Sequence, residues 1–412
     1  MSHPIIAPVA PEQVVRELTA AARVRRAFQF FETRAAEFTD EQARICAIPA
    51  PPFGEAERAE YLRAKFQECG LTEARTDGEG NCVALRRGRE RRPLLVVSAH
   101  LDTVFPPETD FTVRREQGKM FAPGIADDGC GLAALVALAR ALEECAIETE
   151  GSLLFVGTVG EEGEGNLRGV RHLLTRGRWA SEIDAFISLD GPGIERITHA
   201  ALGSRRYRVR FRGAGGHSWG DFGVVNPVHA LGRAVARLTA YPAPVNPRTT
   251  FNVGRIEGGA GVNVIAREAA MDVDLRSESA EELGRLDAFF RRVAREAADD
   301  ENAARRAGTP PLELDVKLIG DRPSGETPRD SALVRLAEEA TRAFGYRPRF
   351  DCSSTDSNIA IAKGLPAVTL GAGGASGNSH TLDEWFDPRG RDLGLKRALL
   401  VILGTVSMQS RG

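Results

Sequence analysis

The sequence lacks the features that mark two common functional classes. Its 54 basic and 57 acidic residues give a net charge of −3, without the basic excess that a dedicated nucleic-acid-binding protein carries. No stretch approaches the roughly eighteen consecutive apolar residues of a membrane-spanning helix. We therefore expect that neither a nucleic acid nor a membrane is a partner of this protein.

Cysteine is scarce and shows no pattern. The six cysteines are scattered over 412 residues, and no two have the C-x-x-C spacing of a metal-binding or redox motif. The first residues, MSHPIIAPVAPEQVVREL, lack the basic region and long apolar stretch of a secretory signal. Reduced thiols in a cytoplasmic protein are the simplest interpretation.

Apolar runs alternate with helical segments along most of the chain. PLLVVSAH, SLLFVGTV, IDAFISLD and LPAVTLG are typical of buried strands. Helices are predicted over Pro11–Phe38 and within EAERAEYLRAKFQECG, DDGCGLAALVALARALEEC, SALVRLAEEATRAFG and RDLGLKRALLVILGTV. This alternation predicts an α/β fold with a mixed, largely parallel sheet flanked by helices.

The middle of the chain has a different pattern. SRRYRVRFRG alternates basic with apolar residues, which is more typical of a strand with one solvated face than of a nucleic-acid-binding segment. In NPVHALGRAVARLTAYP, Asn226 is a candidate helix N-cap. TTFNVGRIEGG, REAAMDVDLRS and a helix over 281–298 complete this set. We predict a small α+β domain over residues 204–316, inserted into a discontinuous domain of residues 1–203 and 317–412.

Acidic and histidine residues gather where the predicted strands end. Ligands of open α/β sheets bind at the carboxyl ends of the parallel strands. The residues at these ends, at the start of the following helix and in a late glycine-rich loop are His100, Asp102, Asp127, Asp128, Glu161, Glu162, Asp190 and His380. Imidazole and carboxylate are ordinary zinc ligands, and two divalent cations would offset the crowded negative charge.

Each part of this set has a simpler explanation when taken alone. The two glutamates could form a solvated surface pair, the two aspartates could cap a helix, and His100 with Asp102 could be a buried hydrogen-bonded pair. These explanations leave open why all the groups fall at the same end of successive strands. We therefore favour a metal site.

Five motifs occur in the order and approximate spacing of the M20 family of dinuclear zinc metallopeptidases: SAHLDTV, GIADDGCGLAAL, GEEGEG, SLDG and GNSHTLDEW. The resemblance extends over nearly the whole chain from about His100 onward. It implies hydrolysis of an amide bond in small peptides or N-acyl amino acids by a zinc-exopeptidase-like fold. It also implies two divalent ions, with zinc preferred over cobalt or manganese, and a homodimer formed through the inserted lid or dimerisation domain.

The resemblance further assigns roles to single residues of the α/β domain. Asp127 would lie between the two ions, and the peptide bond after it is cis in the family. Asp102 would orient the imidazole of His100, and Glu161 would act as the general base. The complete set of metal ligands would be His100, Asp127, Glu162, Asp190 and His380.

Three residues in or near the inserted domain would contact the substrate. His217, in GAGGHSWGD, would help to hold the oxyanion in the partner subunit's site, and Asn263, in GGAGVNVIA, would contact the substrate there. Arg322, in DRPSG, would bind a substrate carboxylate, which suits its planar guanidinium. His217 and Asn263 could instead be turn residues, and Arg322 a surface charge.

Two other functions remain open on the sequence. A hydrolase of N-carbamoyl amides could use the same scaffold, although such relatives tend to have histidine where this chain has Asp190. A non-catalytic binding protein could retain the fold without the chemistry. The presence of Glu161 argues against the second alternative, because a protein that has lost its catalytic function would be expected to have lost its general base first.

Overall fold

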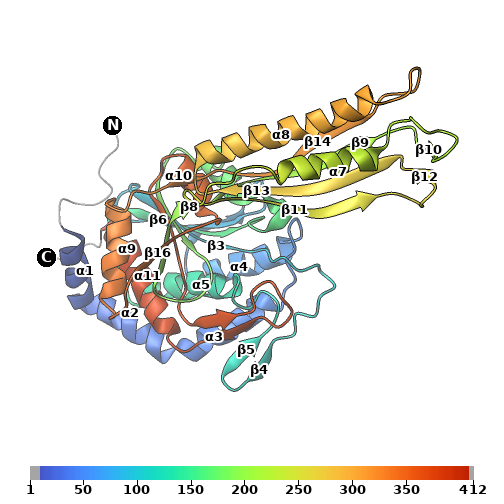
Figure 1. Ribbon diagram of the computed structural model, residues 1–412. Helices are drawn as coiled ribbons and strands as arrows, with labels where there is room; N and C mark the ends of the chain where they lie inside the picture. Colours follow the sequence, from blue (N-terminus) through green and yellow to red (C-terminus); the bar gives the residue numbers. More distant parts are fainter. Residues whose placement is uncertain (1–9, 408–412) are drawn as a thin grey trace. The chain divides into compact units, whose positions relative to one another are not determined.

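The computed structural model describes residues 10–407 and divides into two compact units (Figure 1). The first unit comprises residues 10–201 and 326–407, and the second is Leu202–Gly325. The sequence places the end of the inserted domain at residue 316, whereas strand β14 (Glu313–Arg322) carries the second unit beyond that point. The first nine residues, where a secretory signal would begin, lie outside the described residues.

A mixed sheet forms the centre of the first unit, with the order β1-β2-β6-β3-β7-β17-β8-β15 and with β16 paired to β8. The central neighbours β6, β3, β7 and β17 are parallel, whereas β1–β2, β2–β6 and β17–β8 are antiparallel. The predicted mixed and largely parallel sheet is confirmed. The strands are β1 (Thr72–Thr76), β2 (Cys82–Arg86), β3 (Leu94–His100), β6 (Ser152–Thr158), β7 (Ile183–Leu189), β8 (Arg196–Ala201), β15 (Gly325–Glu326), β16 (Arg349–Ser353) and β17 (Ala367–Leu370).

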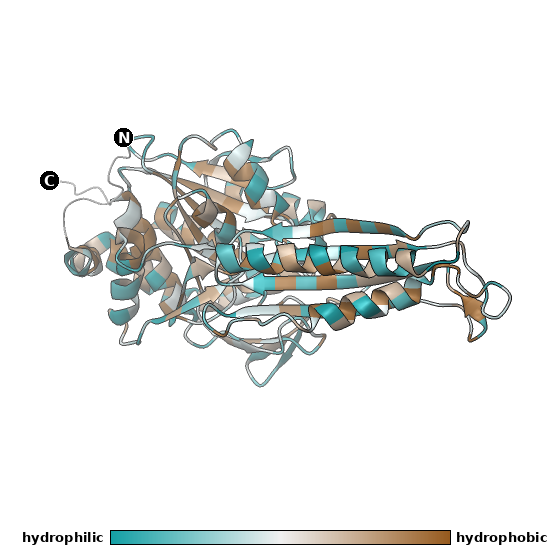
Figure 2. Cartoon of the chain, turned by 45° about the horizontal axis from the view of Figure 1, so that its top comes forward, coloured by the Kyte–Doolittle hydropathy of each residue, from teal (hydrophilic) through white to brown (hydrophobic). Residues whose placement is uncertain are grey.

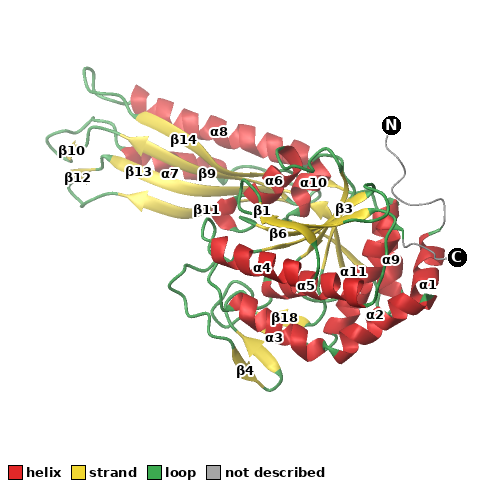
Figure 3. Ribbon diagram, turned by 180° about the vertical axis from the view of Figure 1, so that it is seen from behind, coloured by secondary structure: helices red, strands yellow, loops and turns green. Residues whose placement is uncertain are grey.

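Helices cover both faces of this sheet (Figure 3). Along β3, Leu95 and Val97 pack into one core, whereas Leu94 and Val96 pack into a second core. Because both faces are buried, the strands are continuous apolar runs in the sequence. The first core contains α1 (Pro11–Ala20), α2 (Ala22–Thr33), α3 (Ala35–Cys46), α4 (Ala56–Glu68), α5 (Gly129–Glu144), α9 (Ala332–Arg342) and α11 (Arg391–Val406), and the second contains α6 (Arg168–Thr175) and α10 (Ser357–Ala362).

Two local features of the first unit differ from the sequence prediction. The helical stretch expected over Pro11–Phe38 is interrupted, because Ala21 has an extended backbone and Arg34 separates α2 from α3. A second, small antiparallel sheet with the order β18-β19-β5-β4 was not predicted. Its strands are β4 (Arg114–Glu116), β5 (Lys119–Phe121), β18 (Ala375–Gly377) and β19 (Trp385–Asp387).

The second unit is an antiparallel sheet with the order β11-β13-β9-β14, packed against two helices. Tyr207 and Phe211 of β9 lie in its core, whereas Arg208, which alternates with them, forms an ion pair with Asp272 on the neighbouring strand. The alternation of brown and teal along these elements in Figure 2 shows the same pattern. The elements are α7 (Pro227–Leu238), α8 (Ala280–Ala303), β9 (Gly203–Arg212), β10 (Gly216–His217), β11 (Thr249–Gly258), β12 (Val264–Ile265), β13 (Glu268–Ser277) and β14.

The cysteines and the helices agree with what the sequence leads us to expect. Five cysteines are buried thiols that form no disulfide: Cys46, Cys69, Cys82, Cys130 and Cys145. Between residues 10 and 407, no helix combines the length and the apolar character needed to cross a bilayer.

Arg58 of α4 is a fully buried cation that ties a loop to the end of strand β3. Its guanidinium donates to the carbonyls of Ile48, at 3.0 Å, and of Leu101, at 2.7 Å. Leu101 directly follows His100, the last residue of β3. Burial lowers the pKa of Arg58, and two hydrogen-bonded carbonyls compensate part of the desolvation cost.

We expect that Arg58→Met lowers the free energy of unfolding by about 2–4 kcal/mol, because two buried carbonyls lose their donor. Arg63→Met on the same helix is the matched control, since Arg63 pairs with the exposed Glu60 and a surface pair contributes about 0–1 kcal/mol. Calorimetric or denaturant unfolding of both variants measures the difference. Equal stability of the two variants would show that Arg58 does not anchor β3.

Candidate metal centre

The parallel strands of the first unit end at one edge of the sheet, and the predicted site residues start from that edge. His100 is the last residue of β3, and Asp190 directly follows β7. Glu161 and Glu162 follow β6, and the chain that leaves β17 reaches His380 in the loop between β18 and β19. The carboxyl edge of the parallel strands therefore supplies side chains from segments that are far apart in the sequence.

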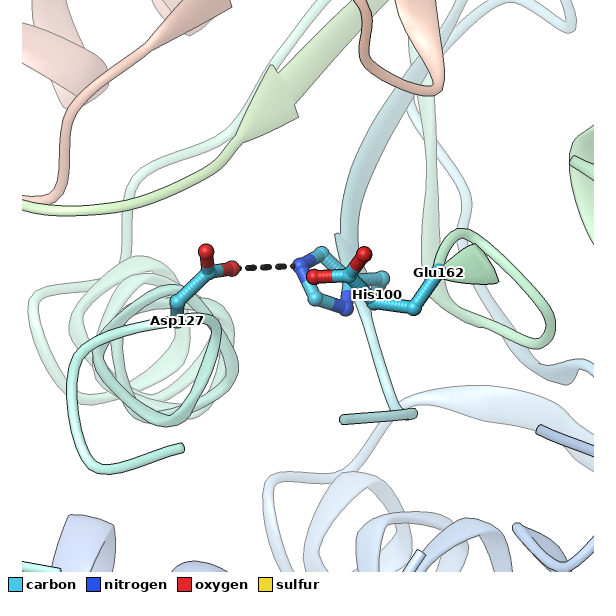
Figure 4. Close-up of side chains that lie close together, drawn as sticks. All are labelled: His100, Asp127 and Glu162. Carbon is cyan, nitrogen blue, oxygen red and sulfur yellow. Dashed lines mark hydrogen bonds and ion pairs between the residues drawn. The ribbon is translucent and has the colours of Figure 1, made fainter. Parts of the chain in front are cut away.

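His100, Asp127 and Glu162 form a tight group (Figure 4). One possible ligand atom of each residue lies within 4.8 Å of the others. His100 Nε2 is 2.9 Å from Asp127 Oδ1, and the glutamate carboxylate faces the same imidazole. One imidazole and two carboxylates at this spacing are a suitable ligand set for a divalent metal ion.

His380 joins this group from the loop between β18 and β19. Its Nε2 is 2.9 Å from Glu162 Oε1 and 3.1 Å from Asp127 Oδ2. The two carboxylate oxygens of Asp127 therefore face two different histidines, His100 and His380. His380 itself has a positive φ of 65°, which is uncommon for a non-glycine residue and turns the loop sharply at the site.

The charges in this group perturb one another strongly. Burial lowers the pKa of His100, but the hydrogen bond to Asp127 and the nearby carboxylates outweigh it, so that this pKa lies well above its usual value. The hydrogen bonds to Asp127 and Glu162 raise the pKa of His380 to about 10. The carboxylates thus attract positive charge to the imidazole nitrogens, which is the electrostatic setting that a cation would meet.

Asp190 lies beside the tight group rather than within it. Together with Asp127 it lines a cavity of about 480 Å³. Burial and then the charge of Asp127 raise the pKa of Asp190. The structure therefore brings all five predicted metal ligands to one place, with four connected by hydrogen bonds and Asp190 on the adjoining cavity wall.

The sequence VGEEGEG forms a tight turn after β6 that buries its first two glutamates. Glu161 and Glu162 are buried, whereas Glu164 is exposed. A side chain on Gly165 would come within 2.4 Å of the Cα atom of Gly160, so the two ends of the turn touch through their backbones. Gly165 is required by this close approach, whereas Gly160 and Gly163 have the positive φ angles that favour glycine.

Asp102 holds the two glutamates through their backbone. Its buried carboxylate accepts hydrogen bonds from the N–H groups of Glu161, at 2.9 Å, and Glu162, at 2.7 Å. The predicted contact with His100 is made mainly by the carbonyl of Asp102, which is 2.9 Å from Nδ1, whereas the nearest carboxylate oxygen is 3.7 Å away. One residue thus orients the imidazole with its backbone and fixes the glutamate turn with its side chain.

Asp128 has a larger role than the helix cap that the sequence suggested. It caps α5 through Gly131 N at 3.0 Å, and it also accepts from the N–H groups of His100, at 3.2 Å, and Gly191, at 3.3 Å. It therefore links the residues that end β3 and follow β7. The peptide bond between Asp127 and Asp128 is cis, as the resemblance implied.

Glu384 is a functional candidate that sequence reasoning missed. It is fully buried, and its carboxylate accepts from the backbone N–H groups of Gly124, Ala126 and Asp127 at 3.1, 2.8 and 2.9 Å. Burial raises its pKa to about 7. The only signal in the sequence is an acid that follows His380 by four positions and precedes the apolar residues of β19.

The second unit contains the three predicted substrate-binding residues. His217 and Asn263 are exposed neighbours, since β10 pairs with β12 and Ser218 N donates to the Asn263 carbonyl at 3.0 Å. Arg322 is buried at the end of β14, which does not fit a surface charge. It lies in the second unit, although the predicted boundary assigns it to the α/β domain.

Comparison with known families decides the assignment. The model of peptidase family M20/M25/M40 matches residues 96–402, which is most of the chain and includes every residue of the cluster. The chain belongs to the M20 peptidase family. It is therefore a hydrolase of the metallopeptidase class, as the motifs implied.

Individual M20 relatives are similar over most of their length. The chain is 26% identical to the uncharacterized protein YqjE of Bacillus subtilis, over 81% of this chain and 89% of the relative. It is 25% identical to succinyl-diaminopimelate desuccinylase of Corynebacterium glutamicum, over 83% and 89% of the two chains.

Solved structures show the same M20 fold. A tripeptidase from Staphylococcus aureus superimposes with a TM-score of 0.75 at 22% identity, over 90% of this chain and 98% of that chain. The YXEP protein of Bacillus subtilis, described as a dinuclear metal-binding peptidase of the M20 family, gives a TM-score of 0.66 at 18% identity, over 91% and 99%.

We expect that Glu384→Gln lowers the affinity for metal by roughly 10- to 100-fold, the range found when a group behind a ligand is changed. The side-chain amide of the variant would place its N–H₂ group against the backbone N–H groups that Glu384 now accepts from, including that of Asp127. Two donors would then face each other, and the loop that carries Asp127 would lose an acceptor. Asp383→Asn, at the exposed neighbouring position, is the matched control. Competition with a metal-chelating dye gives both affinities, and equal values would show that Glu384 does not position the ligand loop.

Proposed function

We propose that this protein hydrolyses an amide bond in small peptides or N-acyl amino acids with two divalent metal ions, zinc being the first candidate. Asp127 carries the proposal, because its two oxygens face different histidines. A carboxylate placed in this way can share its oxygens between two ions. His100 would hold one ion, His380 and Glu162 would hold the other, and Asp190 would complete the set from the cavity wall.

Glu161 is the proposed general base. It is buried next to the proposed ligand Glu162, and Asp102 fixes the backbone of both residues. When bound, the metal ions supply Lewis acidity that polarises the scissile carbonyl and lowers the pKa of water. Glu161 takes the proton from the attacking water and passes it to the leaving amine.

The alternative functions have less support. N-carbamoyl-amide hydrolases tend to have histidine where this chain has Asp190, and release of ammonia from such substrates would identify that activity. A non-catalytic binding protein would not need a buried carboxylate at position 161, since burial of an acid costs free energy unless a partner compensates it. Both alternatives are tested by a substrate panel that also contains N-carbamoyl amino acids.

The test of the proposed function is hydrolysis of a substrate panel before and after metal removal. Protein stripped with chelator should be inactive, and Zn²⁺ or Co²⁺ should restore cleavage of di- and tripeptides or N-acyl amino acids. Glu161→Gln should lower kcat by about 10²–10⁴-fold, the usual contribution of a general base, while metal content by elemental analysis stays unchanged.

Glu164→Gln is the control, because this neighbouring glutamate is exposed. Full activity of the Glu161→Gln enzyme would remove Glu161 from the mechanism. A fully metallated wild-type protein that cleaves no member of the panel would reject the proposed function itself.

We also propose a cytoplasmic location. The five buried thiols that form no disulfide support it, because disulfides persist mainly in oxidising compartments.

The second unit is proposed to supply substrate contacts to the partner subunit of a homodimer. His217 and Asn263 lie side by side, and the apolar side chains of Trp219, Phe222 and Val262 next to them are highly exposed. Brown segments in Figure 2 mark these loops around β10 and β12. Large exposed apolar side chains are common at protein interfaces, which supports a two-fold contact of this unit.

Mixed dimers test whether His217 acts on the partner's site. His217→Ala and Glu161→Gln subunits should each be poorly active alone. If His217 acts on the partner subunit, random mixing should restore about a quarter of the wild-type activity. Half of the dimers are then mixed, and only one of the two sites in each mixed dimer has both an intact Glu161 and an intact His217. Sedimentation must show exchange of subunits; exchange without recovery would place His217 in its own subunit's site.

A further inference from the structure

The cavity beside Asp127 and Asp190 has a basic wall that metal binding does not explain. Its volume is about 480 Å³, within the usual range for a small-molecule site. Arg196, Arg349 and Arg389 line it together with the two aspartates. All the lining residues belong to the first unit.

Two of these arginines are placed directly opposite one another. β16 pairs with β8 in parallel, and Arg349 is the partner of Arg196 in the register. Like charges at such positions repel each other, and an anion beside them would relieve the repulsion that remains with Arg349 exposed and Arg196 half-buried. The Arg196 guanidinium donates to the backbone carbonyl of Asp190, and this carbonyl is a neutral acceptor.

A buried cation lies behind the same loop. Arg397 of α11 is fully buried and donates to the carbonyls of Ile194, Arg196 and Gly371, at positions that border the cavity loop. Burial and then the charge of Arg196 lower its pKa to about 9. Its hydrogen bonds are to carbonyl oxygens, so the positive charge of Arg397 adds to that of the cavity wall.

Apart from Asp127 and Asp190, which are assigned to the proposed metal ions, the acidic groups near the wall offset only part of this charge. Asp387 pairs with Arg389, and Glu195 lies exposed on the cavity lining. The guanidinium of Arg349 makes no hydrogen bond or ion pair with any residue from 10 to 407, and the same holds for the hydroxyl of Tyr346, which also lines the cavity. Two donors are thus available beside the proposed metal ions.

We propose that this cavity is a specificity site for a carboxylate of the substrate, bound by Arg349 and Tyr346 and attracted by the surrounding arginines. The inference rests on the proposed amide hydrolysis, because the cavity would hold the substrate carboxylate close to the amide bond that is cleaved. A planar guanidinium with free donors is well suited to a carboxylate, and a phenol hydroxyl adds a further donor. The preferred substrates are therefore acidic acyl groups or acidic amino acids.

Matched substrates separate charge from shape. N-acetylglutamate is compared with N-acetylglutamine for an acid on the amine side, and N-succinyl with N-succinamoyl amino acids for an acid on the acyl side. In at least one pair the acidic member should have the higher kcat/KM. Arg349→Met should lower that value by roughly 10- to 100-fold, as expected for a lost hydrogen bond to a charged group, and leave the neutral member nearly unchanged.

Arg347→Met is the control, because Arg347 belongs to the same loop but lines a neighbouring cavity. Tyr346→Phe should have a smaller effect in the same direction. If the enzyme cleaves both members of each pair equally well, or if Arg349→Met affects them equally, the specificity site is rejected while the proposed function stands.

A binding measurement tests the site without catalysis. Calorimetry of the metal-loaded protein with glutarate, a dianion, and with its monoamide, a monoanion, measures the contribution of the second carboxylate, since either compound can place one carboxylate on a metal ion. Wild type should bind glutarate at least tenfold more tightly, and Arg349→Met should abolish the difference. Equal affinities in the wild type would overturn the proposal even if no substrate of the panel is cleaved.

Discussion

The structure depends on the concentration of negative charge at one edge of a buried parallel sheet. Adjacent parallel strands bring their carboxyl ends together, and in this chain those ends lead to carboxylates that burial and mutual repulsion disfavour. The imidazoles of His100 and His380 lie between the acids and share hydrogen bonds with them. This M20 hydrolase thus places its candidate reactive groups where the fold concentrates charge, and the proposed pair of cations would stabilise that charge.

Several of the acids serve the backbone rather than the reaction. Asp102, Asp128 and Glu384 are buried, and each accepts hydrogen bonds from the N–H groups of residues in or beside the ligand loops. Charged acceptors form stronger hydrogen bonds than neutral ones, so these carboxylates hold the loops more firmly than carbonyls would. The cluster therefore combines the proposed metal ligands with acids that fix the backbone of those residues.

The sequence was most informative where burial is simple and least informative where distant segments meet. Strand β3 was predictable because its alternate residues enter two different cores, which requires a continuous apolar run. The break at Ala21 was not predictable, since alanine favours helix and its extended backbone is determined by packing. The role of Glu384 was also hidden, because its donors at Gly124–Asp127 lie about 260 positions earlier and only the folded chain brings them together.

The loop between β18 and β19 carries both His380 and Glu384. One of these residues faces the proposed ions, and the other holds the backbone on which Asp127 is mounted. A displacement of this short segment would withdraw the imidazole of His380 and, by moving Glu384, would also release the backbone that positions Asp127. We therefore expect occupancy of the site and order of the loop to be thermodynamically coupled.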